Sequence, residues 1–189
     1  MTSSIRFTSS DLEGLPDIDG TRYEIIDGDL HVSKQPQWHH QFACTAALSA
    51  LHIWSQQTGA GVANMAPGLI FAADDDVAPD VVWMSWERRA VLLDEGGHLR
   101  GAPELVIEVL SPGSATEKRD RELKLKLYSR QGVHEYWIID WRLRLVQVYR
   151  REQAILTLVT TLESDDSLSS PLLPGFACSV SSLWEPPIA

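Results

Sequence analysis

The chain has 189 residues, 44% of them hydrophobic and 22% charged, and a formal net charge of −10 at pH 7. This length and balance are typical of one soluble globular domain, and we expect residues 1–189 to form a single unit. No apolar run reaches the ~18 residues of a membrane span, and the N-terminus lacks the basic and apolar segments of a secretion signal. We therefore expect a cytoplasmic protein without a membrane partner, in which Cys44 and Cys178 are reduced and buried.

Basic residues concentrate in one segment of this acidic chain. Residues 117–151 contain ten Lys or Arg and five Asp or Glu, a balance of +5, so the remaining residues carry −15. The overall acidity argues against strong non-specific binding to nucleic acid. The basic segment either belongs to the candidate site described below or consists of the solvated faces of a helix and a hairpin.

A short helix and a β-hairpin are expected near the N-terminus. Ser9 or Ser10 follows a polar stretch and is expected to cap the helix. The hairpin is predicted over residues 23–32, where Asp-Gly separates two strand-like runs and favours the positive φ angles of a two-residue type I′ turn. Glu24 lies in the first strand of this hairpin.

A long helix and two strands follow the hairpin. Apolar residues recur at helical spacing over residues 37–57, and the Thr-Gly-Ala-Gly sequence after them ends the helix. Short strands are expected near residues 61–65 and 68–72. The aspartates at 74–76 then form a turn, which is either a solvated loop or a cation site. The loop is preferred, because consecutive side chains diverge and no calcium-loop glycine pattern surrounds them.

The second half of the chain alternates between strand-like and helical patterns. A strand is expected over residues 80–85, and the apolar run over residues 104–110 predicts a central strand that is buried on both faces. A helix is expected over residues 115–130, and Gly132 suits the left-handed position just after its end. The remaining expected elements are strands over residues 135–140, 143–150 and 154–162 and a last apolar segment, a short helix, before residue 184.

Two carboxylates accompany the predicted strands. Side chains two apart on a strand share a face, so Glu108 points the same way as Val106 and Leu110. An unpaired carboxylate in such an apolar run is costly to bury, and a cation, a hydrogen bond or a basic side chain must offset that cost. Asp80 begins another strand and is expected to face the same cavity. The alternatives are a buried ion pair at Glu108, for instance with Lys124, and a turn-capping role for Asp80.

Two such carboxylates suit Mg²⁺, which prefers oxygen ligands, polarises a phosphoryl oxygen and lowers the pKa of a bound water. A nearby lysine would stabilise charge that develops on a phosphate or orient the attacking water. Lys124 is the expected lysine, because it is four residues from Asp120 and from Tyr128 and so shares one helical face with both. Lys126 lies on a different face and is expected to be solvated.

These residues resemble the Uma2 family, which is described as restriction endonucleases within the PD-(D/E)XK nuclease superfamily. The resemblance extends over about residues 7–184, and its motifs occur in the family's order and spacing. The matching segments are Tyr23–Leu30, Ala78–Val82, Pro103–Pro112, Arg119–Asp120 with Lys124 and Tyr128, Gly132–Asp140 and Leu173–Phe176.

The resemblance implies an α/β (α+β) fold with a restriction-endonuclease-like mixed central β-sheet, flanking helices and an N-terminal β-hairpin. It implies a catalytic site in which Asp80 and Glu108 bind metal and Lys124 assists. The superfamily's lysine usually stands two residues after the acidic residue, where this chain has Leu110. In this family, the resemblance implies, that lysine has moved to the following helix, at Lys124.

Further site residues are implied by the same resemblance. Glu24 matches a hairpin glutamate that approaches the metal site, and we count it as a third metal ligand. Asp120 and Tyr128 are implied as supporting residues, Asp120 by orienting the lysine. His39 and His40 fall where the family often has a histidine at the head of its helix. We count neither as a ligand, and a role at the helix start or on the substrate side is left open.

Three functions are compatible with this sequence. The first is an endonuclease that hydrolyses DNA phosphodiester bonds with Mg²⁺, or with Mn²⁺ in its place, and the complete set of Asp80, Glu108 and Lys124 favours it. The second is a catalytically silent nuclease-like scaffold that binds nucleic acid or protein; the acidic charge and the lack of a DNA-reading module favour it. The third is a metal-dependent hydrolase of another phosphate ester. A homodimer would suit cleavage of both strands of a duplex, and the seven tryptophans leave room for an apolar interface.

Overall fold

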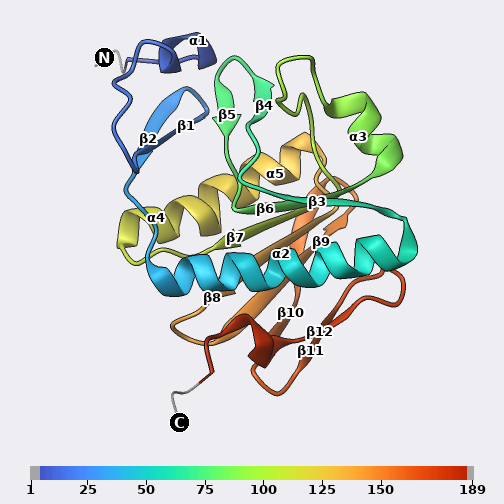
Figure 1. Cartoon of the computed structure of the whole chain (residues 1–189). Coiled ribbons are helices and arrows are strands. Elements are labelled where there is room, and N and C mark those ends of the chain that lie inside the picture. The colour runs from blue at the N-terminus through green and yellow to red at the C-terminus, as the bar shows by residue number, and fades with distance from the viewer. Residues whose placement is uncertain (1–4, 187–189) are drawn as a thin grey trace.

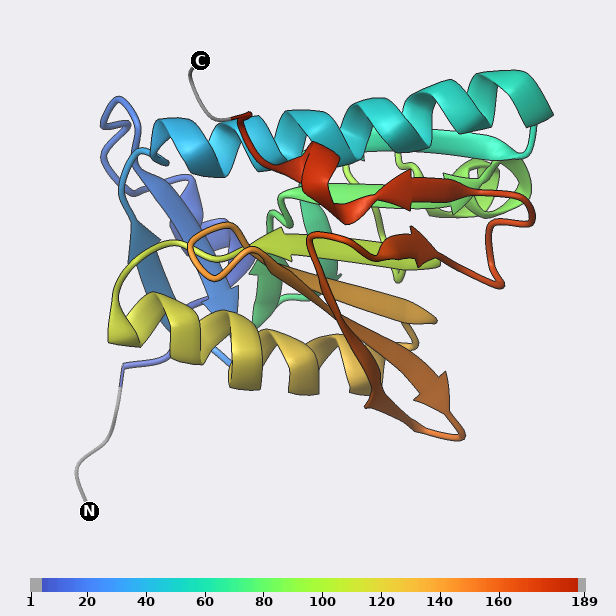
Figure 2. The same ribbon diagram turned by 90° about the horizontal axis from the view of Figure 1, so that it is seen from below.

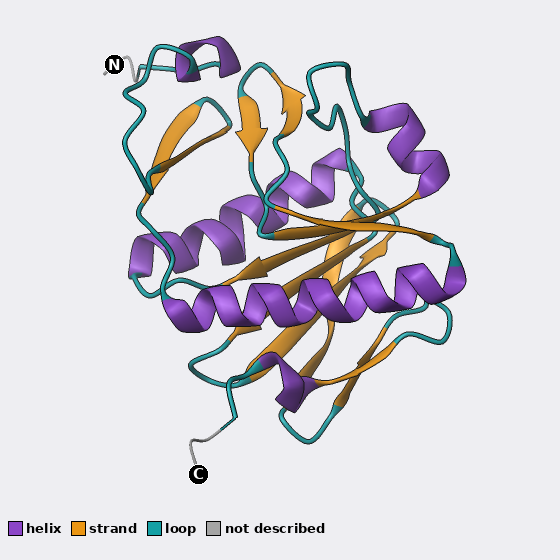
Figure 3. Cartoon of the chain, in the orientation of Figure 1, coloured by secondary structure: helices purple, strands orange, loops and turns teal. Residues whose placement is uncertain are grey.

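The computed structural model describes residues 5–186, apart from the side chain of Ser114. Its centre is a six-stranded sheet with the strand order β10–β9–β8–β7–β6–β3 (Figure 1, Figure 3). Strands β7 and β8 run parallel, and the other neighbouring pairs run antiparallel. The strand bounds are β3 Gly61–Met65, β6 Val81–Ser85, β7 Leu105–Val109, β8 Glu135–Asp140, β9 Leu145–Glu152 and β10 Ile155–Glu163. The predicted mixed central sheet, with β7 in its interior, is confirmed.

A second, four-stranded sheet contains the predicted hairpin and has the order β2–β1–β5–β4. Its strands are β1 Arg22–Ile26, β2 Asp29–Ser33, β4 Leu69–Ala72 and β5 Asp75–Val77. Asp27 and Gly28 have φ angles of 51° and 73°, as a type I′ turn requires. The interpretation of aspartates 74–76 as a solvated loop is wrong for Asp75, which begins β5, is buried and pairs with Arg130.

Helices cover both faces of the central sheet (Figure 2). One face carries α2, Trp38–Thr58, and the C-terminal segment. The other face carries the four-stranded sheet and one continuous helical segment. This helical segment consists of α4 Ser114–Lys118, the π-helix η1 Arg119–Lys124 and α5 Leu125–Gln131. Gly59 and Gly132 follow α2 and α5 with φ angles of 69° and 94°, a left-handed backbone that glycine adopts readily.

Each face of the sheet has its own hydrophobic core. The odd-numbered residues of β7 pack beneath α2 and the C-terminal segment. Val106 and Leu110 pack on the opposite side, with Leu127 and Tyr128 of α5. The alternation predicted for this strand is therefore confirmed, and Glu108 shares the face that lies beneath the helical segment.

Three shorter elements complete the fold. The first helix, α1 Ser9–Leu12, is capped by Thr8 rather than by Ser9 or Ser10. A further helix, α3 Trp86–Leu92, follows β6 directly. The tail forms a small hairpin that the sequence pattern does not indicate, β11 Ser167–Ser169 with β12 Ala177–Ser179, before the expected helical turn, η2 Val180–Leu183. Among residues 5–186 there is no helix with the length and apolar character needed to cross a membrane.

Candidate active site

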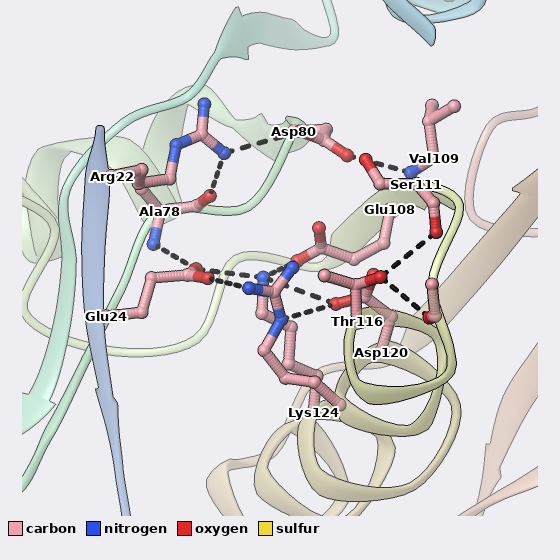
Figure 4. Close-up of polar contacts among 12 residues, drawn as sticks. Arg22, Glu24, Ala78, Asp80, Glu108, Val109, Ser111, Thr116, Asp120 and Lys124 are labelled. Carbon is pink, nitrogen blue, oxygen red and sulfur yellow. Dashed lines mark hydrogen bonds and ion pairs between the residues drawn. The ribbon is translucent and has the colours of Figure 1, made fainter. Parts of the chain in front are cut away.

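Asp80 and Glu108 lie at one end of the β6–β7 pair, as Figure 4 shows. The register of these antiparallel strands pairs Val81 with Ile107, so Asp80 and Glu108 lie opposite each other at the adjacent position. The Val109 N–H donates a hydrogen bond of 2.8 Å to Asp80 Oδ2. Both carboxylates line a cavity of about 550 Å³. Two acids that are far apart in the sequence thus share one cavity.

Lys124 lies behind Glu108 and joins three carboxylates. Its Nζ is 2.9 Å from Glu108 Oε1, 2.9 Å from Glu24 Oε1 and 3.8 Å from Asp120 Oδ1. The side chain is only 1% exposed and does not line the cavity. Lys124 therefore contacts Glu108 from the side of the protein interior, not from the cavity. Lys126, in the same helical segment, is exposed as expected.

Glu108 and Asp120 receive further hydrogen bonds from the helical segment. The Tyr128 hydroxyl donates to Glu108 Oε1 over 2.8 Å. Arg119 Nε donates to Asp120 Oδ1 over 2.9 Å, and its Nη1 lies 3.2 Å from Glu24 Oε2. The two expected supporting residues thus both contact the cluster, Tyr128 through the carboxylate of Glu108 and Asp120 through Arg119 and the lysine.

The π-helix brings three charged residues of one segment to the same side. A π-helix bonds residue i to residue i+5, so its turn is wider than that of an α-helix. Arg119, Asp120 and Lys124 are all buried within η1, against the sheet. The predicted helix is present, but this local widening has no signal in the apolar periodicity. Single π-turns of this kind are frequent at functional sites.

Asp80 is held from three sides. Its Oδ2 accepts the Val109 N–H and lies 3.3 Å from His40 Nε2, while its Oδ1 lies 3.4 Å from Arg22 Nη1. Burial by itself raises the pKa of Asp80, but contact with His40, the charge of Lys124 and the Val109 N–H together lower it to about 2. Asp80 is therefore an anion at neutral pH.

The pKa of Glu108 is shifted in the opposite direction, upwards. Burial is the largest cause, and together with the neighbouring carboxylates it raises the pKa of Glu108 to about 8, against the opposing charge of Lys124. The cavity therefore borders one firmly ionised carboxylate and one that holds its proton more strongly. A cation that enters the cavity would favour the ionised form of Glu108.

Glu24 occupies the far end of the cluster. Its Oε1 accepts the Ala78 N–H over 3.0 Å in addition to its contact with Lys124. Burial raises the pKa of Glu24, but Lys124 and Arg119 outweigh it and the net effect is a lower pKa. Glu24 is buried and does not line the cavity. Its contacts are those of a residue that holds Lys124, and its role as a metal ligand stays a prediction.

Arg22 and Arg119 line the cavity, and sequence reasoning assigned neither a role. The Arg22 side chain is 36% exposed and that of Arg119 is 11% exposed, so both are accessible from the cavity. Arg22 stands two residues before Glu24 on β1 and so shares its face, a pattern that could have been noticed. The inward direction of Arg119 depends on the π-helix and had no comparable signal.

The two histidines at the start of α2 differ in position. His40 is buried, lines the cavity and contacts Asp80. His39 is exposed, and its ring centroid lies 5.1 Å from that of Trp141. Leu110, at the superfamily's usual lysine position, is fully buried in the core. Of these residues, only His40 joins the candidate site.

Two donor sets at the cavity have the chemistry to hold a cation. Asp80 and Glu108 form an all-oxygen set of the kind that Mg²⁺ prefers. Within residues 5–186, no hydrogen bond to Glu108 Oε2 is formed, and the contact of Asp80 Oδ1 with Arg22 is long at 3.4 Å. The second set is mixed: His40, Cys44 and Asp80 are buried, with their donor atoms within 4.8 Å of one another.

The mixed central sheet flanked by helices is of the restriction-endonuclease-like class, and two strand-borne carboxylates border one of its cavities, with Lys124 behind Glu108. The family model Uma2, described as "Putative restriction endonuclease", matches residues 9–181, and the chain belongs to this family. The fold is similar to that of a crystal structure described as "a putative nuclease belonging to DUF820" from Anabaena variabilis. The two are 23% identical with a TM-score of 0.73, and the match covers 94% of this chain and 97% of that chain. No curated protein matches the chain.

Proposed function

We propose that this protein is a divalent-metal-dependent endonuclease that hydrolyses phosphodiester bonds in DNA, with Mg²⁺ as its ion and Mn²⁺ as a substitute. The observation that carries the proposal is the convergence of Asp80 and Glu108 on one cavity that Arg22 and Arg119 also line. Membership of a family described as restriction endonucleases supports the same reaction class and a nucleic-acid substrate.

Asp80 and Glu108 are the residues that would hold the ion. Their oxygen donors fit Mg²⁺, and Glu108 Oε2 and Asp80 Oδ1 are the atoms with the fewest competing contacts. A bound divalent ion would supply charge neutralisation at the phosphoryl group and a lower pKa for a coordinated water. The fit does not require Glu24, whose oxygens face Lys124, Arg119 and the Ala78 N–H.

Lys124 and Tyr128 act as positioning residues in this proposal. Both contact Oε1 of Glu108, at 2.9 Å and 2.8 Å, and so fix that carboxylate with its other oxygen directed elsewhere. The cationic groups on the cavity wall are instead Arg22 and Arg119. Planar guanidinium groups donate paired hydrogen bonds to phosphate oxygens, so these two arginines are suited to bind and orient the phosphodiester.

Nicking of supercoiled plasmid DNA with Mg²⁺ or Mn²⁺ tests this proposal. We expect Asp80→Asn and Glu108→Gln each to lower the rate by at least about 100-fold, the loss typical of an electrostatic group removed from a catalytic site. The matched controls are Asp165→Asn and Glu163→Gln, which neutralise exposed acids near the β10–β11 turn and should keep the wild-type rate. Absence of cleavage on all DNA substrates, or equal rates in site and control variants, would contradict the proposal.

A catalytically silent scaffold is the second candidate, and one observation favours it. Lys124 forms ion pairs with Glu24 and Asp120 inside the protein, as it would in a purely structural network. Such a scaffold would bind DNA in a salt-dependent manner and leave it uncut, and fluorescence anisotropy beside the nicking assay separates the two functions.

Cleavage of a small phosphodiester but not of DNA would instead favour a hydrolase of another phosphate ester. A homodimer stays a prediction that analytical ultracentrifugation can check.

A further inference from the structure

A buried chain of three side chains leads from the cavity into the space beneath α2. Asp80 Oδ2 lies 3.3 Å from His40 Nε2, and Cys44 Sγ lies 3.5 Å from Nδ1 of the same histidine ring. All three residues are buried, with exposed fractions of 7% for Asp80, 5% for His40 and 1% for Cys44. The proposed nuclease reaction uses Asp80 and gives no role to the histidine or the thiol.

The spacing of His40 and Cys44 is that of a chelating pair. Residues four apart on an α-helix lie on one face, as the two histidines of helical zinc-binding motifs do. Asp80 approaches the same face from the start of β6, and its carboxylate supplies a third donor. Donor atoms of the three residues lie within 4.8 Å of one another. Two ligands of one tetrahedral zinc ion are roughly 3.3–3.6 Å apart, given bond lengths of about 2.0–2.3 Å, so only a small movement is needed.

We propose that His40, Cys44 and Asp80 form a binding site for a thiophilic divalent transition-metal ion such as Zn²⁺. A set of one thiolate, one imidazole and one carboxylate is softer than the all-oxygen set of Asp80 and Glu108 and favours Zn²⁺ or Co²⁺ over Mg²⁺. His40 and Asp80 line the cavity, so an ion can reach the site from it, and a water can complete the coordination from the open side.

Binding requires two local changes. The imidazole of His40 divides its two nitrogens between Asp80 and Cys44, so the ring must rotate until one nitrogen faces the ion. The Cys44 S–H bond breaks, a sulfur–metal bond forms, and the proton leaves to the buffer. The negative charge of Asp80 favours an incoming cation, whereas Arg22, 3.4 Å from Asp80, opposes it.

Asp80 belongs to both donor sets, so an ion bound by His40 and Cys44 would affect the proposed nuclease reaction. This consequence alone rests on the proposed function. An ion held by His40, Cys44 and Asp80 would withdraw Asp80 from the all-oxygen set. Zn²⁺ would then inhibit the Mg²⁺-dependent cleavage, and excess Mg²⁺ would not reverse the inhibition efficiently, because Mg²⁺ has little affinity for sulfur.

Titration of the full-length protein with Co²⁺ under anaerobic, reducing conditions tests the site without reference to activity. We expect a stoichiometric complex with a thiolate-to-cobalt charge-transfer band in the near ultraviolet. Cys178→Ser is the informative variant, because it leaves Cys44 as the sole cysteine, and the band should remain. Cys44→Ser should remove the band and weaken Co²⁺ binding by at least about 100-fold, since even outer-shell changes at metal sites cost about 10–100-fold.

The proposal is overturned if the wild type shows no charge-transfer band, or if the band survives in Cys44→Ser and disappears in Cys178→Ser. If Cys44→Ser does not fold, X-ray absorption at the zinc edge of the Cys178→Ser protein decides, because sulfur in the first shell must then come from Cys44. A protein that shows the band but cuts no DNA would retain this site and refute the nuclease function.

Discussion

Replacement of Lys124 by methionine tests whether the carboxylate cluster depends on this one ammonium group. Methionine keeps most of the length of the side chain and removes its charge. In the wild type, Lys124 Nζ lies 2.9 Å from Glu108, 2.9 Å from Glu24 and 3.8 Å from Asp120. Burial lowers the pKa of Lys124, but these three acids outweigh it and raise that pKa above its ordinary value, so the group is charged. The variant leaves buried carboxylates without their main counter-charge.

The expected loss follows from that geometry. Removal of one partner from a buried ion pair costs about 3–5 kcal/mol, and with two close pairs and a third longer one we expect the upper end, about 5 kcal/mol. For a chain of this length about 2–4 °C are lost per kcal/mol, so the melting temperature should fall by roughly 10–20 °C. Thermal and urea unfolding at pH 8 measure the loss. The matched control is Lys126→Met, an exposed lysine of the same helical segment, which should change stability by less than about 0.5 kcal/mol.

The pH dependence of this loss identifies its cause. Without the lysine, ionisation of the clustered carboxylates is what destabilises the fold, so the penalty is present above their ordinary pKa values and disappears as they are protonated below about pH 4. Neutralisation of one acid in the double variant Lys124→Met/Glu108→Gln should recover part of the stability at pH 8. Equal stabilities of Lys124→Met and Lys126→Met at pH 8 would refute the reasoning, because the cluster could not then be held by this amine.

Two further predictions concern a hydrogen-bond partner of Glu108 and the titration of Asp80. Tyr128→Phe removes a buried hydrogen bond to Glu108 and should cost about 1.5 kcal/mol in urea unfolding. This lies between the values for neutral and charged acceptors, because the pKa of Glu108 is about 8. A similar loss in Tyr149→Phe, whose hydroxyl has no hydrogen bond within residues 5–186, would contradict this. The pKa of Asp80 is lowered from 3.8 to about 2, so its ionised form stabilises the fold above pH 3.8, and this stability is lost as the pH falls towards 2. The difference is worth about 2.5 kcal/mol at about 1.4 kcal/mol per pH unit, and Asp80→Asn should flatten the acid limb of stability against pH; an unchanged limb would contradict it.

The elements that could be predicted from the sequence are those with local signals. The Asp27-Gly28 turn demands two positive φ angles, and both occur. The apolar run of β7 indicates a central strand, and its alternation places Glu108 on the face that meets the helical segment. The spacing of Asp120 and Lys124 indicates a shared face, and the two groups lie 3.8 Å apart. Periodicity and turn chemistry act within a few residues, so a single sequence contains them.

The rest depends on contacts between segments far apart in the chain. Asp75 is buried because Arg130, 55 residues later, pairs with it. Arg22 faces the cavity because β1 pairs with β5 and so comes near Asp80. Arg119 turns inward through the π-helix, which no apolar spacing marks. The sequence does not distinguish His40 from His39, because the link of His40 to Cys44 and Asp80 requires α2 to lie beside the start of β6.

The charge balance of the candidate site relates its fold to its proposed chemistry. Four buried carboxylates meet three permanent cations there: Glu24, Asp80, Glu108 and Asp120 against Arg22, Arg119 and Lys124. Lys124 pairs with Glu24 and Glu108, Arg119 pairs with Glu24 and Asp120, and Arg22 lies beside Asp80, so one negative charge of the four carboxylates is left without a permanent counter-charge. Burial and the neighbouring acids raise the pKa of Glu108, so without a metal ion a proton on Glu108 can relieve that excess. A divalent cation would relieve it more completely and would bring positive charge to a bound phosphodiester, as the proposed function requires. The proton on Glu108 thus makes the uncompensated charge tolerable without a metal ion, and the same charge would attract the ion that the proposed function requires.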